Sequence, residues 1–302
     1  MNRFLAGLCV ASAAVAIAAA SAQQSSADEL IERARRALGG DVLATIKTLS
    51  MRASMSLEFG GTIPATNRTV DVSFVSPDKY LRVSRYLPNW PVELELTYYD
   101  GFDGADPIRE LVPSIPQFSV FTDGPRPSES VQAYRARVLF AQQDDFVQRM
   151  LPLFMVLPGR FGLTFIAAGK QAYEGGIAEV IVVSRLGGRR WQLLLDEKSG
   201  LPVRLSWQGP PLAHKETMSV AKRPERGGAV VPTNPPPIVF PVEAPPDAPY
   251  VNWVMTIRDY RRTDGLNWPR RFVTNVNDRR YEDLRVATYR INPPIDVRVF
   301  ER

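Results

Sequence analysis

One long helix-like segment stands in the middle of a chain whose other segments read as strands. Between Ser128 and Gly159 the apolar residues recur at helical spacing, whereas most of the remaining chain alternates apolar and polar residues. This pattern predicts a mainly β, α+β fold in which a sheet wraps a helix. We therefore expect central helices over residues 128–157 to form a plug inside a curved sheet.

Polar residues predict how this helical segment begins, breaks and ends. Ser128 is suited to cap the start, with Glu129 in the first turn. A polar run ending at Asp145 interrupts the apolar pattern, and Asp145 with Gln148 resembles a capping box. A second helix is therefore expected to start near Asp145, and Pro152 predicts a kink or an end close behind it.

The end of the segment, from Met150 to Leu157, carries no charged residue. It is too short to cross a bilayer, which needs about 20 apolar residues. Two interpretations stay open for it, a plug that fills the core and part of a ligand pocket.

The N-terminal residues have the pattern of a secretory signal peptide. Arg3 precedes an Ala-rich apolar run, and Ala20-Ser21-Ala22 is a small-residue cleavage site. We expect a signal peptide over residues 1–22, export across the inner membrane to the periplasm, and no membrane-spanning segment after cleavage. An uncleaved N-terminal anchor is the alternative.

Composition limits the chemistry of the exported chain. The only cysteine, Cys9, lies within the signal segment, so the mature chain is expected to have no disulfides or thiol chemistry. The formal net charge is +5, and the isoelectric point is near 9.4. This mildly basic balance suits anionic surfaces or ligands. Export and the lack of a Lys/Arg-dense tail argue against nucleic acid as a partner.

Strand patterns continue on both sides of the helical segment. An amphipathic helix is expected at 28–38, and the clearest alternation runs from Leu49 to Phe59. The further expected strands are 70–74, 80–86, 92–99, 163–170, 178–184, 189–196, 201–208, 251–261, 266–276 and 282–291. Proline is dense over 230–249, which favours polyproline II and excludes a central strand. This segment fits a domain linker or an inserted loop; similar strands flank it, so we expect a loop within a single domain over 23–302.

Four stretches, in this order, resemble the LolA/LolB-like family of periplasmic outer-membrane lipoprotein carriers, in a longer branch of it. They are ELIERARRALGGDVLATIKTLSMRA, SFVSPDKYLRV with YYDGFDG, WQLLLDEKSGLPVRL, and DYRRTDGLNWPRRF with INPPIDVRVF. The resemblance implies an incomplete antiparallel β-barrel, a half-barrel, wrapped over a helical plug with an apolar cavity between. It also implies lipoprotein sorting, with a lipid or lipoprotein acyl chain as partner.

The chain departs from the carrier proper in two respects. It is longer and contains the Pro-rich insertion. The carrier also uses an arginine of its first strands to hold its lid, and here Arg52 and Arg68 are the candidates for that position.

The residues of types that bind metals or catalyse reactions do not form a recognisable metal-binding or catalytic pattern in the sequence. Asp100, Asp103 and Asp106 are spaced by three, whereas a calcium loop needs every second residue, and Asp-Gly is common in turns. His214, the only histidine, has no Gly-x-Ser-x-Gly elbow beside which to act. The adjacent acids Asp144/Asp145 and Glu282/Asp283 are expected to face water. We expect no enzyme, no catalytic residue, no metal and no cofactor; an envelope hydrolase is a third, weaker hypothesis.

Arginine is dense in the last third of the chain. The residues are Arg258, Arg261, Arg262, Arg270, Arg271, Arg279, Arg280, Arg285 and Arg290. Guanidinium groups suit anionic head groups. Interleaved acids also allow a solvated strand face with ion pairs, and both interpretations remain.

The candidate ligand-binding residues are apolar ones expected to face inward. They are Met51, Met55, Leu57, Phe74, Met150, Phe154, Trp191, Leu193, Trp207, Trp253 and Met255. They would line a pocket for a lipid, acyl chain or other apolar ligand, or fill the core of a ligand-free module that binds an envelope protein. Only the presence or absence of a cavity separates these functions.

Overall fold

The computed structural model describes most of the chain beyond its N-terminal segment. The described residues are 27–58, 65–87, 94–115, 125–157, 159–185, 188–211, 213–217, 238–242 and 247–302. The predicted signal peptide over 1–22 lies outside them, as do residues 230–237 and 243–246 of the Pro-rich segment.

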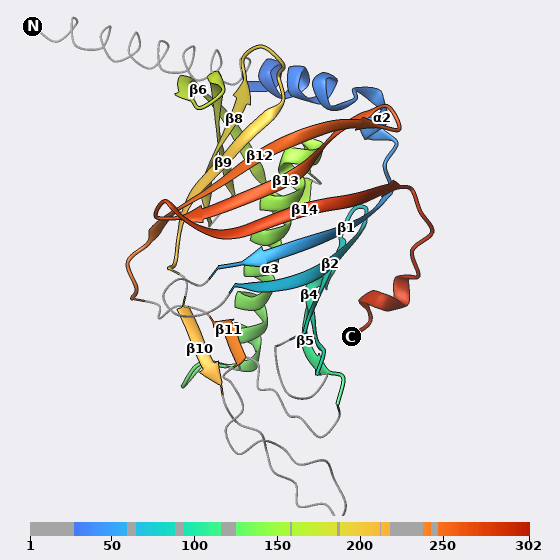
Figure 1. The fold of residues 1–302 in the computed structure, drawn as a ribbon, viewed down its shortest axis with the longest axis vertical. Coiled ribbons are helices and arrows are strands. Elements are labelled where there is room, and N and C mark those ends of the chain that lie inside the picture. The colour runs from blue at the N-terminus through green and yellow to red at the C-terminus, as the bar shows by residue number, and fades with distance from the viewer. Residues whose placement is uncertain are drawn as a thin grey trace, which may run out of the picture.

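Twelve strands form one open antiparallel sheet that curves around a helix (Figure 1). The strands are β1 (Thr48–Leu57), β2 (Thr66–Val75), β3 (Lys79–Tyr86), β4 (Leu96–Asp103), β5 (Asp106–Pro113), β6 (Leu163–Tyr173), β7 (Gly176–Arg185), β8 (Arg190–Asp196), β9 (Pro202–Gly209), β12 (Val251–Thr263), β13 (Leu266–Val276) and β14 (Arg279–Ile291). Their order across the sheet is β5-β4-β3-β2-β1-β14-β13-β12-β9-β8-β7-β6, so β5 and β6 are unclosed edges. The predicted half-barrel over a helical plug is confirmed.

The region after β3 differs from the prediction. The predicted turn at Asp100-Gly101 lies inside β4, and the strand β5 was not predicted at all. Gly101 is needed because a Cβ there would lie 2.0 Å from the Tyr80 carbonyl oxygen of β3. Two strands approach closely at this glycine, and the chain turns at Gly104, whose φ is 60°.

The central helix α3 (Val131–Phe154) is continuous, so the predicted break and restart near Asp145 are wrong. The polar residues there turn to the sheet instead of ending the helix. Gln142 donates to the Ile108 carbonyl at 2.6 Å, and Asp144 and Asp145 accept from arginines. Tertiary partners therefore satisfy side chains that, in the sequence alone, resemble a helix start.

Both ends of α3 are defined by local geometry. The N-cap is Ser130, whose hydroxyl accepts from the Ala133 amide at 3.1 Å, and not the predicted Ser128. Pro152 lies in the last turn, and the helix ends at Met155 in a left-handed conformation with φ 61°. The proline thus marks the end of the helix, close to the predicted position.

The C-terminal half of α3 fills one end of the half-barrel. The Phe146 ring lies 5.4 Å from that of Phe74, 5.2 Å from Tyr80, 5.6 Å from Phe102 and 4.8 Å from Phe161. These contacts join α3 to β2, β3, β4 and the short turn η1 (Gly159–Phe161). This end is a packed core.

Smaller elements cover the ends and the outer face of the sheet (Figure 1). A helix over 27–38 and α2 (Asp41–Ala44) lie at one end, where Asn267 donates to the Ala37 carbonyl at 2.6 Å. The turn η2 (Val297–Phe300) packs Phe300 against the outward side chains Leu81 and Ile108.

Part of the Pro-rich segment is a strand, which the prediction of a loop over 230–249 did not include. Strand β11 (Ile238–Val242) pairs with β10 (Ala213–Thr217) in a separate two-stranded sheet. In a two-stranded sheet each strand keeps a free edge, so Pro241 costs no central hydrogen bond. Within the described residues, no helix has both the length and the apolar character needed to cross a bilayer.

Candidate ligand-binding site

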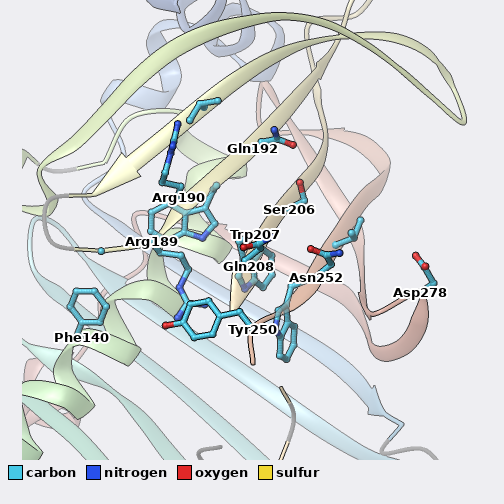
Figure 2. A pocket seen from close by; sticks show the side chains of 15 residues that line it. Phe140, Arg189, Arg190, Gln192, Ser206, Trp207, Gln208, Tyr250, Asn252 and Asp278 are labelled. Atoms are coloured by element: carbon cyan, nitrogen blue, oxygen red, sulfur yellow. The ribbon is translucent and has the colours of Figure 1, made fainter. Parts of the chain in front are cut away.

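A cleft of about 850 Å³ opens where β8, β9 and β12 approach α3 (Figure 2). Phe140 of α3 lies on one side of it, and Trp191, Trp207 and Trp253 of the three strands line the other. Tyr250, which is 67% exposed, borders it just before β12. The volume is within the range of sites that hold small apolar ligands.

The three tryptophans form one row across neighbouring strands. In the sheet register Trp191 lies opposite Trp207, and Trp207 lies opposite Trp253. The Trp207 and Trp253 rings stack with centroids 5.8 Å apart and planes 10° apart. The Trp253 indole N–H donates to the Pro210 carbonyl at 3.1 Å. Trp191 is fully buried and Trp207 is 9% exposed, so the row forms the floor of the cleft rather than an open wall. Polar side chains complete the lining: Arg190, Gln192, Ser206, Gln208, Asn252 and Asp278.

An ion-pair cluster fastens α3 to the rim of this cleft. Arg189 Nε donates to Asp144 at 2.7 Å, and Arg185 Nη1 donates to the same carboxylate at 3.2 Å. Gly209 leaves room for this arrangement, because a Cβ there would lie 2.5 Å from Arg189 Nη1 and 3.2 Å from Trp253 Nε1. Burial raises the pKa of Asp144, and the two arginines offset only part of that shift.

A second ion-pair chain ties α3 to the middle of the sheet. Arg82 Nη1 of β3 donates to Asp145 at 3.1 Å, and the Tyr80 hydroxyl donates to it at 2.9 Å. Arg149 meets both oxygens of Glu282 on β14 at 2.9 Å and lies 3.4 Å from Asp145. Burial raises the pKa of Asp145, but the two arginines and the tyrosine outweigh it and hold that pKa below its usual value.

The two arginines that the resemblance singled out lie on opposite faces of the sheet. Arg52 faces outward and donates to Asp71 at 2.8 Å. Arg68 faces inward, is 7% exposed, and lies over the rings of Tyr86 and Tyr98. Neither one donates a hydrogen bond to α3 in the described part of the chain, so neither fastens this helix.

The predicted ligand-binding residues fall into two groups. Trp191, Trp207 and Trp253 line the cleft. The others are not among the cleft-lining residues: Met51, Met55, Leu57, Phe74, Met150, Phe154, Leu193 and Met255. They belong to the continuous core around α3, which also includes Trp191 and Trp207. Sequence reasoning did not identify Phe140, Arg189 or Tyr250, and no periodicity marks them as lining a cleft.

The other candidate groups are engaged with neighbours. Lys79 pairs with Asp103, and Arg135 pairs with Asp106 at 2.7 Å. Among the described residues no cluster of three or more His, Cys, Asp or Glu side chains could hold a metal ion. His214 lies in β10, whose side chains are outside the described part.

The arginine-rich face of the last strands contains ion pairs. Arg271 makes two hydrogen bonds to Asp283, at 2.9 and 2.8 Å, and Arg285 donates to the same carboxylate at 3.1 Å. These two arginines pair across β13 and β14. Arg271 and Arg285 therefore form ion pairs on the strand face, which is one of the two interpretations that the sequence allowed.

The chain has been compared with known families and structures. No family model and no curated protein matches it. A DUF1329 family protein from Desulfovibrio piger is similar at 9% identity with a TM-score of 0.45, over 91% of this chain and 96% of that one. An outer membrane lipoprotein-sorting protein domain from Vibrio parahaemolyticus is similar at 9% identity with a TM-score of 0.45, over 91% of this chain and 97% of that one. A LolA superfamily protein from Nitrosomonas europaea is similar at 6% identity with a TM-score of 0.46, over 91% of this chain and 96% of that one.

Proposed function

We propose that this chain binds a lipid, an acyl chain or another apolar ligand in the tryptophan-lined cleft and carries it through the periplasm. The observation that supports this most directly is the cleft itself, with Trp191, Trp207 and Trp253 in one row opposite Phe140 of α3. The motifs shared in order with lipoprotein carriers support the same class of ligand.

Burial of apolar surface would supply the binding energy. Each methylene group moved from water to an apolar wall contributes about 0.8 kcal/mol. Aromatic side chains offer large, stiff surfaces that lose little side-chain freedom when a ligand packs on them. A flexible acyl chain along the tryptophan row therefore needs few specific polar contacts.

Release would involve movement of α3. Arg189 both lines the cleft and holds Asp144 of α3, so a shift of the helix would change the rim of the cleft directly. The anchors of α3 through Asp144 and Asp145 lie on strands at different parts of the sheet. If only the ion pairs of Asp144 broke, α3 would separate from the rim of the cleft, while the contacts of Asp145 would still hold α3 to the middle of the sheet.

Lipid binding to the purified chain tests the proposal. Native mass spectrometry should show lipid adducts, and a brominated fatty acid should quench the tryptophan fluorescence. Trp207→Leu should weaken fatty-acid binding about tenfold, because one stacked wall of the cleft is lost. The matched control is Trp268→Phe, since Trp268 is buried in the core beside Tyr289 and should not affect binding. Absence of adducts and of quenching would refute carriage.

A second function is favoured by the packed end of the half-barrel. Phe146, Met150 and Phe154 fill the space that a deep ligand pocket would occupy. A ligand-free module that binds an envelope protein would need only such a filled core and an exposed surface. It would show no lipid adducts yet pull down a defined envelope partner that variants of surface residues abolish.

A further inference from the structure

A buried arginine without a hydrogen-bond acceptor lies on the inner face of the sheet. Arg68 on β2 alternates with the buried residues Val70 and Val72, and 7% of its surface is exposed. Its Nε and Nη2 atoms are buried and have no hydrogen-bond partner among the described residues. Because a guanidinium stays charged and carries five N–H donors, this side chain is an unsatisfied cation.

Aromatic rings surround the Arg68 guanidinium. Its Cζ atom lies 5.3 Å from the ring centroid of Tyr86 on β3 and 5.5 Å from that of Tyr98 on β4. Cation–π contact attracts the charge but leaves the N–H groups without acceptors. Burial lowers the pKa of Arg68; Tyr98 and Tyr281 offset part of this shift, and the nearby cation Arg82 adds to it.

Asp100 and Glu282 of the sheet and Asp145 of α3 already have partners. Asp145 and Asp100 each accept a hydrogen bond from Arg82. Glu282 receives both terminal nitrogens of Arg149. An acceptor for Arg68 would therefore come from outside this network, and it would carry negative charge, because a buried unpaired cation is costly.

Arg68 does not line the cleft itself, but Tyr281 of β14 lies on a strand between β2 and the strand of Trp253 in the sheet order. The pairing of β13 with β14 passes from Thr274–Glu282 to Asn275–Arg280 and leaves Tyr281 in a bulge. This bulge places the Tyr281 ring edge-on to Trp253 at 5.7 Å. Tyr281 and Arg68 flank β1 near its end, because the Tyr281 carbonyl accepts from the Glu58 amide at 2.8 Å and Met55 pairs with Arg68. The cleft and the buried cation are thus linked through one tyrosine.

We propose that Arg68 binds the anionic head group, a carboxylate or a phosphate, of an amphiphile whose apolar chain lies along the tryptophan row. A guanidinium can give two parallel N–H bonds to either oxyanion, which matches its unsatisfied donors. The inference rests on the proposed function and adds the class of ligand. The head group would supply an acceptor to a buried cation that has none among the described residues.

Three lipids with the same acyl chain test the inference: palmitate, 1-palmitoyl-lysophosphatidate and 1-palmitoylglycerol. The wild-type chain should bind at least one of the two anionic lipids about tenfold more tightly than the neutral one, as charge-assisted hydrogen bonds allow. The anionic lipid that is preferred identifies the head group. Arg68→Met should bind all three equally, and its melting temperature should be unchanged or higher. Arg52→Met is the matched control, because Arg52 is an exposed arginine on the outer face, and it should keep the preference.

The outcomes separate the two proposals. If none of the lipids binds, the proposed function and the inference both fail. If the neutral lipid binds as tightly as the anionic ones, only the inference fails. Should Arg68→Met not fold, Arg68→Lys, which keeps the charge without the fork, should bind the anionic lipids more weakly and the neutral one unchanged. Unchanged affinity of that variant for all three lipids would overturn the assignment to Arg68.

Discussion

Removing either side chain of the Arg149–Glu282 pair should destabilise the fold strongly, whereas replacing both by apolar residues should not. The two side chains are 13% and 6% exposed, and both oxygens of Glu282 lie 2.9 Å from Arg149. The perturbation is a double-mutant cycle of Arg149→Met, Glu282→Leu and the combined variant. Asp145 keeps Arg82 and Tyr80 as partners throughout the cycle.

The size of the effect follows from burial. Breaking a buried pair by removing one partner costs about 3–5 kcal/mol, because a desolvated charge is left alone. In Arg149→Met the buried Glu282 carboxylate is left without its partner, so we expect a loss of about 4 kcal/mol. In Glu282→Leu the arginine keeps Asp145 at 3.4 Å, so we expect about 3 kcal/mol. With the double variant within about 2 kcal/mol of wild type, the coupling free energy is about 4 kcal/mol or more.

Urea unfolding at pH 7, followed by circular dichroism, measures these quantities. The midpoints should shift while the slopes stay equal, so that stability and not compactness has changed. Single losses below about 1 kcal/mol, or a double variant equal to the sum of the singles, would refute the view that this pair is a coupled, desolvated anchor of α3.

Three further predictions use the same unfolding assay. Ser130→Ala should cost about 1 kcal/mol because the α3 cap is lost, whereas Ser128→Ala should cost nothing; a larger loss at Ser128 would contradict the observed cap. Gly101→Ala should cost about 3 kcal/mol, because its Cβ would meet the backbone of the neighbouring strand, and a neutral result would mean that the two strands lie further apart. Asp145 has a lowered pKa in the folded chain, so its stabilising effect is present above its ordinary value of 3.8 and is lost as the pH falls through the folded-state pKa. The stability gap between wild type and Asp145→Asn should therefore narrow from pH 5 towards pH 2, and a constant gap would contradict this.

The strands could be predicted because one-sided burial imposes a period of two. Met51, Met55 and Leu57 alternate with polar neighbours. In the structure these three side chains are buried, and their polar neighbours are partly or fully exposed. The strand β5 escaped prediction because its side chains are mostly half-exposed on both faces, so no strict alternation marks it. Gly101 likewise reads as a turn until a neighbouring strand is known to approach it.

The cleft could be predicted only in part. Alternation identifies Trp191, Trp207 and Trp253 as inward residues, together with six other strand residues that have the same pattern, and helical spacing adds Met150 and Phe154. Which inward residues face a helix and which face open space depends on where α3 lies, and α3 is placed by contacts between residues far apart in the chain. Periodicity describes a side chain's face of the sheet and carries no information on what covers that face.

The sequence by itself determined the class of fold: alternating strands around a central helical segment, with an open antiparallel sheet implied by the resemblance to lipoprotein carriers. The tertiary structure decided that the helix is continuous, because Gln142, Asp144 and Asp145 bond to the sheet. It also decided that Arg68 is buried between the rings of Tyr86 and Tyr98, with no acceptor for its Nε and Nη2 atoms in the described part of the chain. Local pattern specifies the faces of strands and helices, and long-range packing specifies the partners of each charge on them.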